Sequence, residues 1–361
     1  MKLDLLRLLL LFIVLNCNAS ACDLQLSSNI LFSKDCEIQD KFESLKLLYS
    51  QHGSNIDDVV EYKALRFIDR KSWQKNINKE KNDPRFIYRP YSLTWDIWVS
   101  GINSIFSDHE VTLQTLFFNL SELSRVNKLL LTDSRNDISA TKFDNAGELR
   151  NSIFDGNVGF CSILSSKILN EHYSKIEKSM NDYVSNWEKL SGISFKKLVK
   201  QYNGESPSNA TLGINLSVRD NRCNDRKNHF TYYVSSSKVE KYLNWLGIFI
   251  DYNLKLYHRG ELIVSPIEFA SFVQKVFVTI HPFHDGNGRT SRVIQDLILK
   301  EFGMPYAPSG DLQSDILLSF ESYRARTYSK FESMLNFLEK CLDESLSKEM
   351  LLRCESYSET L

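Results

Sequence analysis

The sequence predicts an all-α, mostly helical protein, and two observations favour this fold class. Apolar residues recur at helical spacing in most segments of the 361-residue chain, with few alternating runs. Helix start and stop signals bound several of these segments. One short stretch, 229–237, has the aromatic and β-branched run before a serine cluster that favours a strand. An apolar content of 42% is that of an ordinary globular protein with a full core.

The first 21 residues are predicted to be a cleaved signal peptide. Basic residues precede a leucine-rich run over 8–15, and residues 19–21 have the small-x-small pattern that signal peptidase accepts. The apolar run is shorter than the roughly 20 residues that cross a bilayer, so we expect a secreted protein without a stable membrane span. A retained anchor is one alternative. A lipoprotein attached at Cys22 is another, although Ala19 stands where a lipid-attachment box has its apolar residue.

The cysteine count agrees with export. Removal of the signal peptide leaves six cysteines, an even number that an oxidising compartment would pair. Proximity in sequence suggests the pairs Cys22–Cys36, Cys341–Cys354 and Cys161–Cys223. Six buried free thiols are the alternative. The chain has no C-x-x-C pair, which argues against a zinc ribbon or a thioredoxin-like site.

Charge excludes two classes of partner. The formal net charge is −1, so no basic field points to nucleic acid and no polybasic run points to an anionic membrane. The kind of partner must therefore be inferred from a site.

The first two thirds of the chain are predicted to alternate between helices and polar loops. Residues 111–131 and 163–190 have helical spacing and are separated by a loop that begins at 132. Residues 69–85 form a solvated surface or loop, and the Asn-, Ser- and Gly-rich segment 201–229 is an exposed excursion. A helix then follows over 238–260, with basic residues in its last turn and Gly260 as its stop.

The clearest helix begins at Ser265. This residue can cap the helix, Pro266 suits its first position, and Glu268 completes a capping box. One face is apolar, formed by Phe269, Phe272, Val273, Val276, Phe277 and Ile280. A second core helix follows the loop and is closed by Gly303 and Pro305; its apolar face is Val293, Ile294, Leu297, Ile298 and Phe302. A polar loop between two core helices is held rigidly, as a catalytic loop should be.

This loop, "HPFHDGNGRTSR" at 281–292, has the residue types that bind phosphate. Gly286, Asn287 and Gly288 lie just before the second helix, where unpaired N–H groups and the positive end of the helix dipole attract an anion. The glycines let backbone approach a phosphate, and Asn tolerates left-handed conformations. Arg289 and Arg292, at i and i+3, can bind a polyphosphate from one helix face.

The same loop offers a base and a metal ligand. Asp285 is a carboxylate of the kind that holds Mg²⁺ beside substrate phosphates. His281 can take a proton from an attacking hydroxyl because its ordinary pKa is near neutrality. Pro282 and Phe283 are expected to fix the loop against the core, and His284 has no assigned role. Together these groups are what phosphoryl or nucleotidyl transfer requires.

The loop resembles the signature of the Fic family, His-x-Phe-x-Asp/Glu-Gly-Asn-Gly-Arg followed two residues later by a second Arg. Every defined position is matched over 281–292. The resemblance implies a Fic-type helical bundle with a small β-hairpin flap. It also implies a protein adenylyltransferase, which uses ATP as substrate and Mg²⁺ as cofactor to place AMP on a Ser, Thr or Tyr hydroxyl of a target protein.

Roles carry over position by position under this resemblance. His281 would deprotonate the target hydroxyl, and Asp285 would hold Mg²⁺ at the α- and β-phosphates. The three residues at 286–288 would hold the α-phosphate, Arg289 the outer phosphates and Arg292 the γ-phosphate. Two features favour nucleotide transfer. Relatives that phosphorylate carry Lys at the position of Gly288, and a phosphocholine-transferring relative carries Asp-Ala at 285–286.

The resemblance divides the chain. A catalytic core would span 108–342 with an insertion near 160–228, after an N-terminal extension at 22–107 and before a tail at 343–361. Within the core, "AGELR" at 146–150 is similar to an upstream Gly-x-x-Arg segment of relatives. The segment 229–240 would be the flap that aligns the target backbone by strand addition.

The sequence departs from the family pattern at one feature, the inhibitory helix. Many Fic proteins carry an inhibitory helix that reads Ser/Thr, three residues, Glu, then Gly/Asn. Ser33–Glu37 and Ser345–Glu349 have this spacing, but Ile38 and Met350 follow them. Either the chain is not autoinhibited, or its inhibitor is divergent or a separate protein.

The expected function is AMP transfer by an exported effector. Because exported bacterial space lacks ATP, the target would be a host protein, or the chain would enter a eukaryotic secretory lumen; sequons at Asn119, Asn209 and Asn215 permit the second. The alternatives are another nucleotide or a phosphocholine donor, and a non-catalytic binding module on the same scaffold.

Overall fold

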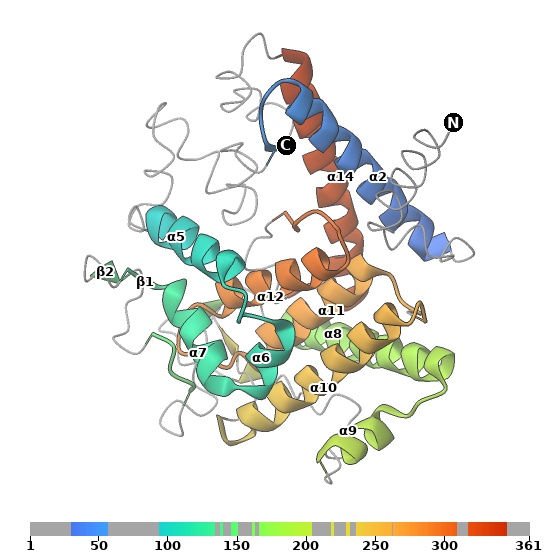
Figure 1. The fold of residues 1–361 in the computed structure, drawn as a ribbon. Helices are drawn as coiled ribbons and strands as arrows, with labels where there is room; N and C mark the ends of the chain where they lie inside the picture. The colour runs from blue at the N-terminus through green and yellow to red at the C-terminus, as the bar shows by residue number, and fades with distance from the viewer. Residues whose placement is uncertain are drawn as a thin grey trace, which may run out of the picture.

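The computed structural model describes eleven ranges of the chain, and every structural statement below refers to them. They are 30–56, 94–133, 138–139, 146–150, 161–162, 166–203, 218–219, 229–231, 236–261, 263–308 and 317–344. The predicted fold class is confirmed, because these residues are mainly helical with a few very short strands (Figure 1).

Ten named α-helices and five short strands are described. The helices are α2 (Ile30–Gln51), α5 (Thr94–Ser107), α6 (Leu113–Phe118), α7 (Leu120–Leu129), α8 (Ser166–Ser191), α9 (Phe195–Asn203), α10 (Val239–His258), α11 (Pro266–Ile280), α12 (Asn287–Glu301) and α14 (Phe320–Glu344), with α9 the shortest after α6. The strands are β1 (Thr132–Asp133), β2 (Ile138–Ser139), β3 (Cys161–Ser162), β4 (Val218–Arg219) and β5 (His229–Thr231). A single turn of 3₁₀-helix, η5 (Ser236–Lys238), leads into α10.

Helix α11 lies at the centre of the fold. It packs against α12, α14 and α10, and α10 in turn packs against α6 (Figure 1). All fifteen of its residues are buried, so its polar side chains are enclosed as well as the apolar face that the sequence predicted. Since α11 is fixed on several sides, the loop at its C-terminal end is fixed too.

The start of α11 has the predicted cap and proline, but the predicted capping box is not formed, because the Glu268 carboxylate binds Arg324. Ser265 caps the helix by accepting a hydrogen bond from the Glu268 N–H at 3.1 Å, and Pro266 occupies the first position. The carboxylate of Glu268 pairs with the guanidinium of Arg324 on α14. Glu268 therefore connects α11 to α14.

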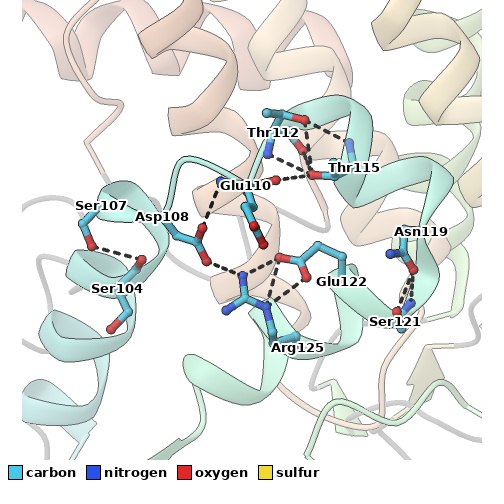
Figure 2. A network of polar contacts seen from close by, with 10 residues as sticks. All are labelled: Ser104, Ser107, Asp108, Glu110, Thr112, Thr115, Asn119, Ser121, Glu122 and Arg125. Atoms are coloured by element: carbon cyan, nitrogen blue, oxygen red, sulfur yellow. Dashed lines mark hydrogen bonds and ion pairs between the residues drawn. The ribbon is translucent and has the colours of Figure 1, made fainter.

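The helix predicted over 111–131 is broken into α6 and α7 at Asn119. The side chain of Asn119 accepts hydrogen bonds from the backbone N–H and hydroxyl of Ser121, which caps α7 and ends α6 (Figure 2). Arg125 on α7 reaches both Glu122 and Asp108, so the end of α5 is joined to α7 (Figure 2). An Asn within an apolar-periodic run is a helix cap here, because its side chain competes for backbone N–H groups.

The strand predicted in 229–237 is present as β5. It is the central strand of a three-stranded antiparallel sheet in the order β3-β5-β4. Over residues 229–231 both backbone edges of β5 are therefore already paired, so a target segment could add only to the outer edge of β3 or β4. Residues 232–235 lie outside the described part of the chain.

Helix α2 belongs to the predicted N-terminal extension and lies beside α14 (Figure 1). Its Asp35 accepts a hydrogen bond from the Ile267 N–H at 2.9 Å and another from the Tyr328 hydroxyl at 2.6 Å. The Gln39 amide donates to the Gly303 carbonyl after α12. These contacts attach α2 to the end of the α11–α12 pair that is opposite the loop at 281–292.

Asp35 makes stability depend on pH. Burial raises its pKa from 3.8 to about 7, although the hydrogen bonds from Ile267 and Tyr328 oppose the rise. Because the folded pKa exceeds the unfolded one, this stabilisation is complete below about pH 4 and is lost as pH rises through about 7, by up to about 4 kcal/mol. Thermal unfolding from pH 4 to 8 should show this fall in the wild type and not in Asp35→Asn. The exposed Asp40→Asn variant on the same helix should follow the wild type; a wild-type slope in Asp35→Asn would contradict the assignment.

Several predictions fall on residues that are not described. These are the signal peptide at 1–21, the polar stretch 69–85, and Cys22, Cys223 and Cys354. Cys36 and Cys341 are both disulfide-bonded, but the partners predicted for them lie outside the described ranges. Among the helices that are described, none has the length and apolar character needed to cross a membrane.

Candidate active site

The chain changes direction sharply where α11 ends. His281 is the C-cap residue, with φ 53° and ψ 60° in the left-handed region, and its N–H donates to the Phe277 carbonyl at 3.0 Å. It is the one non-glycine residue with positive φ in the described chain. Such backbone strain costs roughly 1–3 kcal/mol and persists only where the surrounding structure fixes it.

Gly286 makes the second turn, directly before α12. Its φ is 76°, and it is the N-cap residue of α12. A Cβ here would lie 2.7 Å from the Asn127 Nδ2 and 3.0 Å from the Leu131 side chain. The position requires glycine for its conformation and for the space around it.

Asn287 closes the loop with its side chain. The amide accepts from the Phe283 N–H and donates to the Phe283 carbonyl, both at 2.8 Å, and the residue is 2% exposed. Asn287 is the first helical residue of α12. The left-handed turn before α12 is made by Gly286. Phe283 is fully buried, as predicted, and the side chain of Asn287 is used inside the loop.

Asn127 on α7 connects three parts of the site. Its Nδ2 donates to the Asp285 carbonyl at 3.1 Å and to the Thr290 hydroxyl at 2.9 Å. Its Oδ1 accepts from the Gly147 N–H at 2.9 Å. The residue is fully buried, so these bonds fix the loop and the first turn of α12 relative to α7.

Arg150 lies on the other side of the loop. Its guanidinium donates to the carbonyls of His281 and Ile280, and its backbone N–H donates to the Pro282 carbonyl at 2.8 Å. The preceding residue, Leu149, forms an antiparallel bridge with Phe283. Through Leu149 and Arg150, the segment 146–150 therefore binds the end of α11 and the first residues of the loop.

The environment of His281 keeps its imidazole neutral. Its pKa is lowered from 6.5 to about 3, mainly by burial and also by the positive charge of Arg150, while a hydrogen bond to the Val278 backbone acts in the opposite direction. Burial also lowers the pKa of His284, on which Glu148 and Arg150 have opposite effects. A neutral imidazole can accept a proton at physiological pH.

The N-terminus of α12 is the part of the site suited to an anion. The first helical bond runs from the Thr290 N–H to the Gly286 carbonyl at 2.9 Å, so the N–H groups of Asn287, Gly288 and Arg289 have no partner within the helix. The Gly286 N–H is used by Asp285, which accepts it at 2.7 Å. No atom lies within 4 Å of a Cβ built on Gly288, so the backbone there is open to an approaching group.

Arg289 and Arg292 lie in different surroundings, although their i, i+3 spacing places them on one face of the helix. Arg289 donates from Nη1 to the Leu130 carbonyl at the end of α7, at 3.2 Å. Arg292 lies one turn further along α12 and is half-buried. Both side chains extend from the first two turns of α12, and one guanidinium nitrogen of Arg289 is directed to the end of α7.

Asp285 is the candidate magnesium ligand, and it stands alone as a carboxylate in the loop. Across the described ranges no group of three or more His, Cys, Asp and Glu is arranged to hold a metal ion. Mg²⁺ commonly binds through one or two carboxylates with water and substrate phosphates. One carboxylate beside an anion-binding helix end fits a metal that arrives with a nucleotide.

All seven site residues predicted from the sequence lie in one loop and the first turns of α12, namely His281, Asp285, Gly286, Asn287, Gly288, Arg289 and Arg292. The structure adds Asn127 and Arg150. Asn127 reads as a surface residue of a polar helix, and no local signal marks it. Arg150 belongs to the similarity noted at 146–150, which assigned it no role.

One candidate for the inhibitory helix can be located. Ser33 and Glu37 are exposed residues of α2, which contacts the opposite end of α11 from His281. Helix α11 has fifteen residues, which corresponds to about 22 Å. The segment Ser345–Glu349 lies outside the described residues.

Comparison with known proteins finds similarity to one family over part of the chain. Residues 198–299 match the Fic/DOC family. A Fido domain-containing protein of Dictyostelium discoideum is 31% identical over 98 residues, which are 27% of this chain and 65% of that protein. The protein adenylyltransferase Fic of Nematostella vectensis is 44% identical over 54 residues, 15% of this chain and 13% of the relative.

A bacterial relative carries a different activity in its name. The uridine 5'-monophosphate transferase of Xanthomonas campestris pv. campestris (strain 8004) is 43% identical over 83 residues, 23% of this chain and 15% of that protein. The matched regions thus span less than two thirds of each of these relatives. The similarity is therefore to a part of each relative.

Proposed function

Because this chain carries a Fic/DOC-family domain, we propose that it is a protein adenylyltransferase that moves AMP from ATP to a Ser, Thr or Tyr hydroxyl of a target protein. The observation that carries the proposal is the arrangement of two groups in one loop. His281, whose imidazole is neutral, directly follows the last residue of α11, and the backbone N–H groups at the start of α12 begin six residues later, at Asn287. A base beside an anion site is the minimum that nucleotidyl transfer requires.

In the proposed reaction His281 acts as the general base. It takes the proton of the target hydroxyl while the hydroxyl oxygen attacks the α-phosphorus of ATP. A new bond forms between that oxygen and the α-phosphorus, the bond from the α-phosphorus to the bridging oxygen breaks, and pyrophosphate leaves with the electron pair. Since His281 is uncharged at physiological pH, it is ready to accept the proton.

The phosphates of ATP are bound at the start of α12. The N–H groups of Asn287 and Gly288 hold the α-phosphate, and the open space beside Gly288 lets backbone and phosphate come close. Arg289 binds the outer phosphates and Arg292 the γ-phosphate; Arg289 would exchange its contact with Leu130 for the nucleotide.

Asp285 would hold Mg²⁺ together with phosphate oxygens. The metal supplies positive charge that offsets the charge of the phosphates. The hydrogen bond from the Gly286 N–H orients this carboxylate, and Asn127 fixes its backbone. Orientation of a metal ligand by such outer contacts is a common feature of metal sites.

A second donor is supported by one observation. The Xanthomonas relative is named a uridine 5'-monophosphate transferase, and the loop contacts only phosphates and a hydroxyl in the proposed reaction. UTP is therefore the alternative donor, and both donors leave pyrophosphate. The predicted signal peptide further supports export of the protein as an effector with a host target, or its entry into a secretory lumen that contains ATP.

Labelled nucleotides test the reaction type. The mature protein would be incubated with Mg²⁺ and a candidate host lysate, with ATP labelled at the α-phosphate in one sample and at the γ-phosphate in another. Label transferred to protein from the α position alone is expected. Samples with α-labelled UTP decide between the two nucleotides.

Three results would count against AMP transfer. Transfer from the γ position indicates kinase chemistry, and transfer from UTP in preference to ATP indicates the second donor. An absence of transfer from any nucleotide, in the wild type and in His281→Asn alike, leaves the non-catalytic binding module as the better account.

A further inference from the structure

We propose that Arg150 is a positioning residue for the transfer reaction: its guanidinium and its backbone N–H bind the backbone around His281 and fix this residue at the end of α11. The inference rests on the proposed function in that it takes His281 as the base. It adds a residue from the segment 146–150, which is distant in sequence from the loop.

Arg150 contacts three consecutive residues where α11 ends and the loop begins. Nε donates to the His281 carbonyl, Nη2 donates to the Ile280 carbonyl at 3.1 Å, and the backbone N–H donates to the Pro282 carbonyl at 2.8 Å. Arg150 is 3% exposed, so these bonds are shielded from water. The side chain and backbone of one residue thus bind the backbone on both sides of His281.

These contacts explain how a non-glycine residue keeps positive φ. The last carbonyls of a helix have no partner within it, and a cation near them is favourable because of the helix dipole. The planar guanidinium can donate to two carbonyls at once, which a single ammonium group cannot match. Loss of this donor would leave the Ile280 and His281 carbonyls without these bonds and free the turn to relax.

Arg150 is itself held in place. The Gly147 N–H donates to the fully buried Asn127, and Leu149 pairs with Phe283. A Cβ on Gly147 would lie 2.6 Å from the Ser124 carbonyl, so the segment passes very close to α7. The support for His281 therefore rests on α7.

The charge of Arg150 acts on the imidazole as well. Among the described groups, Arg150 is the charged residue whose field lowers the pKa of His281, next to the larger effect of burial. Glu148, in the same segment, acts on His284 instead. Removing the charge should raise the pKa of His281 part of the way toward 6.5, because burial remains.

Three variants separate the two contributions. Arg150→Gln keeps a hydrogen-bond donor and removes the charge, whereas Arg150→Lys keeps the charge and removes the planar fork. Arg324→Gln is the matched control, since Arg324 pairs with Glu268 at the other end of α11. The full-length mature protein carries ¹³C-labelled histidine, and the His281 resonance is assigned by its absence in His281→Asn.

The titration of the His281 ring by NMR is the first readout. Arg150→Gln is expected to titrate at higher pH than the wild type, and Arg150→Lys and Arg324→Gln at the wild-type position. The second readout is the pH profile of AMP transfer. Its acid limb should move toward pH 6.5 in Arg150→Gln, and Arg150→Lys should keep the wild-type limb with a turnover about 10-fold or more lower because His281 is misplaced.

Two outcomes overturn the inference. In one, Arg150→Gln leaves the titration of His281 unchanged; in the other, Arg324→Gln shifts it as much as Arg150→Gln does. Circular dichroism shows whether Arg150→Gln folds. If it does not fold, the inference would be overturned by an Arg150→Lys variant that transfers AMP as fast as the wild type does. Because the NMR titration needs no substrate, its result stands even if the wild type transfers no nucleotide, so failure of the proposed function is recognised separately.

Discussion

Replacement of His281 by Asn is expected to reduce AMP transfer by a factor of about 10²–10⁴, the usual contribution of a general base. Asn has no group that accepts the proton of the target hydroxyl at neutral pH. It does tolerate the left-handed conformation, and His281 has φ 53°. The loop should therefore keep its shape, and the lost rate should reflect the missing base.

His281→Ala provides the comparison. It should lose as much transfer as His281→Asn, but it places a less tolerant residue in the left-handed region, at a cost of about 1–2 kcal/mol in unfolding free energy. Initial rates with α-labelled ATP and thermal melts by circular dichroism measure the two effects. Transfer within a few-fold of the wild type in His281→Asn, with an unchanged melt, would exclude His281 as the base.

Gly288→Ala and Gly286→Ala are expected to lose activity for different reasons. A methyl group on Gly288 meets no atom within 4 Å, and Ala suits a helix better than Gly, so stability should stay constant or rise by up to about 1 kcal/mol. Transfer should nevertheless fall by about 10²-fold, because the methyl group occupies space where the α-phosphate must come close to backbone.

Gly286→Ala should lose stability together with activity. Its φ of 76° disfavours any residue with a Cβ, and that Cβ would contact Asn127 at 2.7 Å. The two effects together cost about 2–4 kcal/mol. Melting curves and initial rates of both variants test the pair. A destabilised Gly288→Ala, or a fully active one, would contradict the assignment of the phosphate site to the start of α12.

The local sequence was sufficient for the elements that build the site. Ser265 and Pro266 begin α11 as expected, and the apolar spacing after them predicted a helix that packs on one face. The loop residues were predicted together because all of them follow α11 within twelve positions. Short-range signals of this kind depend on caps and periodicity, which are local properties of the chain.

Such local signals could not predict the contacts between segments that are distant in sequence. Asn127 looks like a polar residue of an amphipathic helix, and it becomes a buried connector only because α7 packs against the loop. The break at Asn119 arises because its side chain caps α7, whereas the apolar spacing alone would continue a single helix. The central position of β5 depends on strands from 161–162 and 218–219, far from it in sequence.

Local sequence patterns were enough to predict the helical fold class, the α11–loop–α12 unit and the residue types that suit phosphate transfer. The reason is that helix periodicity, caps and glycine-rich turns are written in neighbouring residues. The contacts of Arg150 and Asn127 with the loop, the left-handed conformation of His281 and the lowered pKa of its imidazole depend on how distant segments pack together. These properties arise from burial and from a charge supplied by a distant segment, which no local pattern encodes.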